Sequence, residues 1–113
     1  MKRIFLIGYM GAGKTTVGKV LSQQLGLSFI DLDHYIEGRY HKTVGQLFAE
    51  RGEEAFRDIE RRMLREVAAF EDVLVSTGGG APCFFDNIEF MNEAGQTVYL
   101  KVSVEELAKR LEL

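Results

Sequence analysis

Apolar and polar positions follow one another along the chain in blocks that predict alternating strands and helices. Residues 3–7 show no alternation of apolar and polar positions, which is typical of a strand covered on both faces. Shorter runs rich in apolar residues predict three more strands, at residues 28–32, 73–76 and 97–102. Helical spacing or turn and cap signals predict helices over residues 14–25, 43–51, 53–70 and 86–94, with a last one from residue 103.

Two of these helices have well-defined faces. In residues 14–25 the face predicted to meet the core carries Val17, Val20, Leu21 and Leu25, and Gly26 provides the stop. In residues 53–70 the predicted core face carries Phe56, Ile59, Met63 and Val67. The opposite face of that helix is predicted to carry Arg57, Glu60, Arg61 and Arg65.

Strands that alternate with helices predict an α/β fold built from parallel β-α units. Right-handed crossovers place helices on both faces of the single sheet, and ligands bind beyond the carboxyl ends of its strands. Three loops follow predicted strands and should meet at that edge: residues 8–15, 31–33 and 77–80. The sequence therefore predicts one cleft assembled from three distant segments.

Composition narrows the class of protein. The chain has 113 residues, 46% of them hydrophobic, which is enough for one domain with a real core. A net charge of −3 argues against nucleic acid as a main partner, because phosphate backbones bind basic faces. The single cysteine cannot form an intrachain disulfide, and no apolar run reaches the ~18 residues of a membrane span. We therefore expect a cytoplasmic protein with no membrane partner.

The first loop matches a phosphate-binding motif. Residues 8–15 read GYMGAGKT, the pattern G-x-x-x-x-G-K-[ST] between a predicted strand and a predicted helix. Its glycines allow backbone N–H groups to converge on an anion, and the helix start adds its positive end. Lys14 is placed to reach the β- and γ-phosphates of a nucleotide, and the Thr15 hydroxyl is placed to bind Mg²⁺.

The second loop places two carboxylates beside this site. Asp31 and Asp33 follow the second predicted strand, and strand alternation would point both the same way. One could help to hold Mg²⁺, directly or through water, and the other could accept a proton from an attacking hydroxyl. The plainer alternative is that Asp33 only caps a helical segment over residues 34–39.

Two further features are weaker on their own. Gly78, Gly79 and Gly80 expose backbone N–H groups, or they form only a turn before the next helix. Arg57 and Glu60 are i, i+3 neighbours that could pair at the surface. Alternatively, Glu60 holds Arg57 so that its guanidinium takes a substrate carboxylate through two parallel hydrogen bonds.

With these motifs in order, the chain resembles a shikimate kinase. The segments that carry the resemblance are GYMGAGKTTVGKVLSQQLG, FIDLD, FRDIE and STGGGAP, at spacings typical of that family and across essentially all 113 residues. The resemblance implies a three-layer fold of the P-loop NTPase type, with four strands of a mostly or wholly parallel sheet here and a fifth missing. It implies one nucleoside-kinase-like domain over residues 1–113, incomplete at its C-terminal end.

The family's roles transfer where the motifs match. ATP phosphates would bind Gly11, Ala12, Gly13, Lys14, Thr15 and Thr16. Mg²⁺ would bind Thr15, assisted by Asp31 through water. Shikimate would contact Asp33, Arg57, Gly78, Gly79 and Gly80, with Asp33 the candidate base and Lys14 the key catalytic cation. The implied reaction is phosphoryl transfer from ATP to the 3-hydroxyl of shikimate, a step of aromatic amino-acid biosynthesis, by a monomer.

The resemblance also implies parts beyond Leu113. These are a mobile lid with a phosphate-binding Arg, a second carboxylate-binding Arg, and a terminal segment with the fifth strand, the last helix and adenine contacts. A chain without them would be a crippled or inactive core that still binds nucleotide, whereas a fragment of a complete enzyme explains the sequence equally well. Two rivals stay open: another small-molecule P-loop kinase, such as a gluconate- or nucleoside-monophosphate-type enzyme, and a nucleotide-binding module without chemistry.

Overall fold

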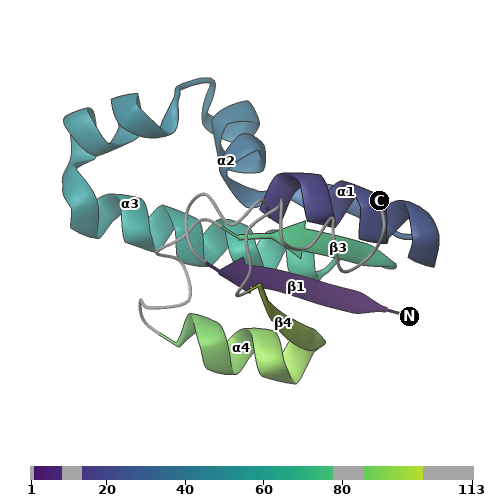
Figure 1. The fold of residues 1–113 in the computed structure, drawn as a ribbon. Helices are drawn as coiled ribbons and strands as arrows, with labels where there is room; N and C mark the ends of the chain where they lie inside the picture. Colours follow the sequence, from purple (N-terminus) through teal and green to yellow (C-terminus); the bar gives the residue numbers. More distant parts are fainter. Residues whose placement is uncertain (1, 9–13, 78–85, 101–113) are drawn as a thin grey trace.

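The fold is built on one parallel sheet. The computed structural model describes residues 2–8, 14–77 and 86–100. Its strands are β1 (Arg3–Gly8), β2 (Ser28–Asp31), β3 (Val73–Ser76) and β4 (Gln96–Leu100). They lie in the order β2-β3-β1-β4, and all three strand pairings are parallel. The predicted α/β class is therefore confirmed, with β1 as a central strand (Figure 1).

Helices cover both faces of this sheet. They are α1 (Lys14–Leu25), α2 (Leu32–Tyr40), α3 (Val44–Ala68) and α4 (Asn87–Ala94). On one face, Ile4 and Leu6 of β1 and Leu74 of β3 pack with Val17 of α1. The other face carries the larger cluster, in which alternate strand residues meet α2, α3 and α4; its members include Phe5, Ile7, Val73, Val75, Ile36, Phe56, Ile59, Leu64 and Met91.

The predicted break within the long helical stretch is real. Thr43 and Gln46 form a reciprocal capping box at the start of α3. Gly52 interrupts the helix with φ 83° and ψ 169°, a backbone conformation that glycine adopts without a steric penalty. The prediction of two helices, over residues 43–51 and 53–70, thus describes α3 well, although its second part ends at Ala68.

Several sequence predictions need correction. Leu25 does not face the core, since this residue is 43% exposed in the last turn of α1. Glu60, predicted on the exposed face of its helix, is buried. The fourth strand begins at Gln96 rather than Thr97. The last predicted helix, from residue 103, lies outside the described residues.

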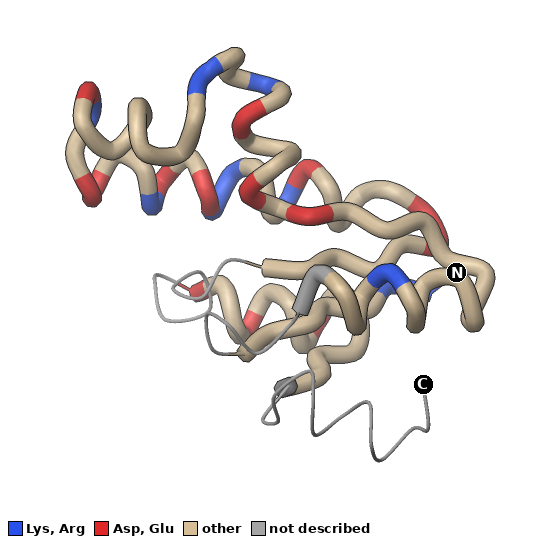
Figure 2. Tube along the Cα trace, turned by 45° about the horizontal axis from the view of Figure 1, so that its top comes forward, with Lys and Arg blue, Asp and Glu red and all other residues tan. Residues whose placement is uncertain are grey.

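Charged residues are unevenly distributed over this framework. Figure 2 shows Lys, Arg, Asp and Glu spread along the helices, with mostly other residue types in the strands. The helices α2 and α3, which pack against each other, carry many of both signs. In the described part of the chain, no helix is long and apolar enough to cross a membrane.

Candidate active site

The carboxyl ends of three strands meet at one edge of the sheet, as predicted. Ser76, the last residue of β3, pairs with Leu6 of β1 on one side and with Asp31 of β2 on the other. The next residue, Thr77, is buried, and both its backbone N–H (3.1 Å) and its hydroxyl (3.3 Å) donate to the Leu6 carbonyl. The starting points of the three predicted loops are therefore brought together.

Parts of the predicted phosphate site and of the predicted substrate site lie outside the described residues. This applies to Gly11, Ala12 and Gly13 of the first loop and to Gly78, Gly79 and Gly80 of the third. The helix α1 begins at Lys14, as the motif requires, and Thr15 and Thr16 follow in its first turn. The roles assigned to these residues stay predictions.

The two aspartates lie at the junction of β2 and α2, but not as strand alternation predicts. Asp31 ends the strand and is the N-cap of α2, where its Oδ1 accepts from the backbone N–H of His34 at 3.1 Å. Asp33 lies in the first turn of that helix. The alternation argument and the proposed capping role of Asp33 are both wrong, because the chain turns helical at Leu32 and the N-cap is Asp31.

The Arg57–Glu60 pair is a buried ion pair and not a surface pair. The Arg57 Nη1 atom donates to both carboxylate oxygens of Glu60, at 3.0 and 3.3 Å. The Glu60 side chain is only 1% exposed and that of Arg57 16% exposed. A buried carboxylate that is bonded in this way restricts the guanidinium to one orientation while leaving part of it at the surface.

Aromatic rings complete the surroundings of Arg57. Its guanidinium carbon lies 5.6 Å from the ring centres of both Phe48 and Phe56, within the range of a cation–π interaction. These two rings stack on each other with centres 4.5 Å apart. The sequence reasoning missed Phe48, although its place in the predicted helix over residues 43–51 could have suggested contact across the break at Gly52.

Asp33 belongs to the same group of charges. Burial raises the pKa of Glu60, the hydrogen bond and positive charge of Arg57 oppose that rise, and the negative charge of Asp33 adds to it. Asp33 on α2 is therefore close enough to Glu60 on α3 for their charges to interact. The structure thus brings together three residues that are up to 27 positions apart in the sequence: Asp33, Arg57 and Glu60.

A cavity of about 470 Å³ lies elsewhere, along α1, β2 and α2. Its lining includes Lys19, Asp31 and His34, but neither Asp33 nor Arg57. It adjoins the proposed site only through Asp31, so we assign it no part in substrate binding.

Comparison with known proteins identifies the family to which this arrangement belongs. A sequence model of the family described as "Shikimate kinase" matches residues 10–113. The chain belongs to the shikimate kinase family. Over all 113 residues it is 82% identical to a curated shikimate kinase from Parabacteroides distasonis, and it covers 65% of that protein's length.

Solved shikimate kinases share the fold. The crystal structure from Bacteroides thetaiotaomicron, at 64% identity, superposes with a TM-score of 0.88 over 98% of this chain and 66% of that one. The enzyme from Acinetobacter baumannii, solved in complex with shikimate, gives 0.86 at 41% identity over 97% of this chain and 62% of that one. The three-layer P-loop kinase fold is thereby established. The chain spans about two thirds of the length of these relatives.

Proposed function

We propose that the protein transfers the γ-phosphoryl group of ATP to the 3-hydroxyl of shikimate. The observation that carries this proposal is the buried Glu60 carboxylate, which holds Arg57 through two hydrogen bonds and interacts with the charge of Asp33. An ion pair placed for stability alone would gain little from such burial, because desolvation offsets the attraction. An oriented guanidinium, with the Asp33 carboxylate interacting with the same buried glutamate, suits an acceptor that carries both an acid group and a hydroxyl.

Arg57 and Asp33 divide the recognition of shikimate between them. The Arg57 guanidinium presents paired N–H donors that match a planar carboxylate. Asp33 accepts a hydrogen bond from the hydroxyl that is to be phosphorylated. Backbone N–H groups of Gly78, Gly79 and Gly80 complete the contacts. The Acinetobacter baumannii relative, solved in complex with shikimate, supports this choice of acceptor.

The nucleotide side uses the first loop. Backbone N–H groups of residues 11–16 and the Lys14 ammonium hold the ATP phosphates. Mg²⁺ favours oxygen ligands and binds through few protein groups together with phosphates, so the Thr15 hydroxyl and the Asp31 carboxylate fit it. Asp31 lies at the end of β2, level with Ser76 of β3. It already accepts the His34 N–H through Oδ1, which agrees with an assisting, water-mediated contact.

The reaction is an in-line displacement. The 3-hydroxyl oxygen of shikimate forms a bond to the γ-phosphorus as the bond from that phosphorus to the β–γ bridging oxygen breaks. Asp33 takes the hydroxyl proton, and the electron pair of the broken bond leaves with ADP. Lys14 neutralises the charge on the transferring group and Mg²⁺ adds to this when bound. Catalysis consists mainly of alignment and charge stabilisation.

A coupled assay of ADP release tests the proposal. The purified protein is given ATP and Mg²⁺, with shikimate, gluconate or a nucleoside monophosphate as acceptor. We expect ADP release that depends on shikimate alone. Release with gluconate or a nucleotide instead would indicate another small-molecule P-loop kinase. ATP binding without release for any acceptor would indicate a nucleotide-binding module. We also propose that the protein acts in the cytoplasm as a monomer.

A further inference from the structure

Hydrogen bonds to the carboxylate of Glu66 join α2 to α3. The Glu66 Oε1 atom accepts from the Tyr35 hydroxyl and from Arg39 Nε, the latter at 3.0 Å. Its Oε2 atom accepts from Arg39 Nη2 at 3.2 Å, so the guanidinium binds both carboxylate oxygens. Tyr35 and Arg39 belong to α2, whereas Glu66 lies in the last turn of α3. These directional bonds therefore fix how one helix lies against the other.

The groups in this contact keep the protonation states that it requires. Burial and then the hydrogen bond to Glu66 raise the pKa of Tyr35, so its hydroxyl stays a donor near neutral pH. Hydrogen bonds from Arg39 and then Tyr35 lower the pKa of Glu66, so its carboxylate stays an acceptor. The Tyr35 ring also lies near that of Phe70, with ring centres 6.1 Å apart.

The same two helices carry the residues that we propose bind the acceptor. Asp33 lies six residues before Arg39 on α2, and Glu60 lies six residues before Glu66 on α3. Six residues of a helix rise about 9 Å. The charges of Asp33 and Glu60 interact, and Glu60 holds Arg57. The Glu66 contact and the Asp33–Glu60 interaction thus join the two helices at two places, separated by the same rise on each helix.

Apolar packing between these helices is extensive but specifies their relative placement less sharply. Buried Leu32 and Ile36 of α2 belong to the core cluster that also contains Ile59 and Met63 of α3. Apolar cores lose uniqueness of arrangement before they lose stability, whereas a polar contact can select one register. The Glu66 contact is therefore suited to select one placement of α2 on α3.

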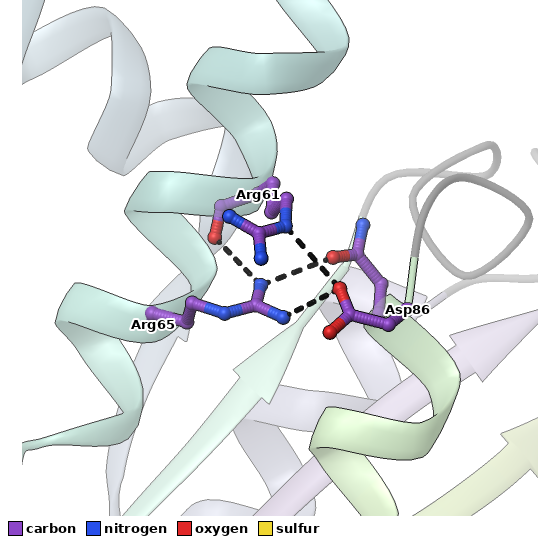
Figure 3. A network of polar contacts seen from close by, with 4 residues as sticks. Arg61, Arg65 and Asp86 are labelled. Atoms are coloured by element: carbon purple, nitrogen blue, oxygen red, sulfur yellow. Dashed lines mark hydrogen bonds and ion pairs between the residues drawn. The ribbon is translucent and has the colours of Figure 1, made fainter.

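The helix α3 is also bound to α4, as Figure 3 shows. The Asp86 Oδ1 atom accepts from Arg61 Nε at 3.2 Å and from Arg65 Nη2 at 2.8 Å. Asp86 is the N-cap residue of α4, yet it makes no side-chain cap hydrogen bond there. Because α3 is held by α4 and packs on β1 and β3 in the core cluster, it is the fixed frame on which α2 is placed.

We propose that Glu66, Tyr35 and Arg39 are positioning residues for the acceptor substrate. Their contact sets where Asp33, on α2, lies relative to Arg57, on α3. This inference rests on the proposed function, because it gives that reaction a specificity device outside the substrate contacts. The side chains of Arg39 and Glu66 are 53% and 34% exposed, and such pairs add little to stability, so their role is placement more than energy.

Substitution of Glu66 tests the inference against a matched control. The variants are Glu66→Gln, which keeps one acceptor oxygen, and Tyr35→Phe, which removes only the hydroxyl. The control is Glu50→Gln, since Glu50 forms an exposed ion pair with Lys42, in the connection before α3, and does not join α2 to α3. For each, kcat, the KM for shikimate, the KM for ATP and the melting temperature are measured on the purified protein.

The expected result is selective. Glu66→Gln lowers kcat/KM for shikimate about tenfold, below the roughly 100-fold cost of a 1 Å misplacement, and leaves the KM for ATP within about twofold. Tyr35→Phe shows a smaller fall in kcat/KM. Glu50→Gln matches the wild type in every constant. If Glu66→Gln melts early, Tyr35→Phe carries the test, because it keeps the ring beside Phe70.

A double-mutant cycle with Asp33 separates placement from a general structural role. Calorimetry measures shikimate binding to the wild type, Glu66→Gln, Asp33→Asn and the double variant. If Glu66 acts by placing Asp33, Glu66→Gln weakens binding in the wild-type background and has much less effect once Asp33 is replaced.

Two results would overturn the inference. One is a kcat/KM for shikimate in Glu66→Gln and Tyr35→Phe equal to that of Glu50→Gln. The other is the same fold loss of binding from Glu66→Gln with and without Asp33. A wild-type protein that releases no ADP with shikimate and does not bind it in calorimetry would refute the proposed function itself, and this inference with it.

Discussion

Two arginine–carboxylate pairs on α3 have almost the same length but very different exposure to solvent. Arg57 and Glu60 approach to 3.0 Å, and Arg62 and Asp58 approach to 3.1 Å. In the first pair the side chains are 16% and 1% exposed, whereas in the second they are 55% and 53% exposed. The distance between the charged atoms therefore does not distinguish a solvated pair from an oriented one, because the difference lies in what packs around each pair.

The surroundings explain why only one pair belongs to a site. Arg57 lies against two aromatic rings, and Glu60 lies close to the charge of Asp33. The second pair projects from the outer side of α3, where water screens each charge. Low exposure makes the first pair costly to break and fixes its direction.

The largest effect is expected from removing the buried carboxylate. Glu60→Ala leaves the Arg57 guanidinium without its main anionic partner, so we expect the free energy of unfolding to fall by about 3 kcal/mol. Urea denaturation measures this fall. Asp58→Ala, treated in the same way, is expected to change it by less than about 0.5 kcal/mol. Equal losses in the two variants would remove the distinction between the pairs.

A milder change tests the shape of the cation and not its charge. Arg57→Lys keeps the positive charge but loses the paired N–H donors, so kcat/KM for shikimate should fall roughly 10- to 100-fold. The loss should appear mainly in the KM for shikimate, which steady-state kinetics measures. Arg62→Lys serves as the control and should leave both constants unchanged. A lysine at position 57 that supports wild-type kcat/KM would contradict bidentate binding.

The pH dependence of stability should have opposite signs at two glutamates. Burial raises the pKa of Glu60, so its contribution is complete below the unfolded-state value near 4.5 and is lost as the pH rises through the folded pKa. Hydrogen bonds from Arg39 and then Tyr35 lower the pKa of Glu66, so its contribution is lost as the pH falls through that lowered value.

Urea denaturation of three proteins between pH 3 and 7 measures these slopes. Relative to Glu60→Gln, the wild type should lose stability as the pH rises above about 4.5. Relative to Glu66→Gln, it should lose stability as the pH falls below about 4.5. Parallel curves for the wild type and Glu60→Gln would mean that Glu60 is not held in a desolvated environment.

The smallest effect concerns salt. Asp58→Asn should lower the free energy of unfolding by less than about 0.5 kcal/mol at low ionic strength. This loss should vanish near 1 M salt, where the screening length is about 3 Å. The cost of Glu60→Gln should persist, because buried pairs are screened much less. Denaturation at two salt concentrations measures both. If the loss of stability caused by Glu60→Gln disappeared at high salt, Glu60 would be exposed to solvent and not buried.

The sequence predicts those features of the fold that depend on neighbouring residues. The apolar run of β1, the capping box at Thr43 and the break at Gly52 depend on neighbouring residues, and all were predicted correctly. The Asp31 cap was missed because a strand that ends in aspartate and a strand that continues to Leu32 look alike in sequence. Leu25 has the right helical spacing, but it is the last residue of α1 and stays 43% exposed.

The site itself was only partly predictable. The burial of Glu60 and the closeness of Asp33 depend on how α2 packs on α3, which no local pattern encodes. The Asp86 contacts join residues 21 and 25 positions apart, and an aspartate before a helix ordinarily predicts a cap. Tertiary packing therefore determines the burial and contacts of these residues, whereas the motifs predict only which residues belong to the site.

The most direct test of the account asks whether Arg57 recognises the carboxylate of shikimate. Calorimetry would compare the binding of shikimate and of its neutral carboxamide to the wild type and to Arg57→Lys. We expect the wild type to bind shikimate at least about tenfold more tightly than the carboxamide, and the variant to lose most of that preference. An Arg57→Lys protein with the full wild-type preference would contradict the claim that the buried pair orients the substrate-binding cation.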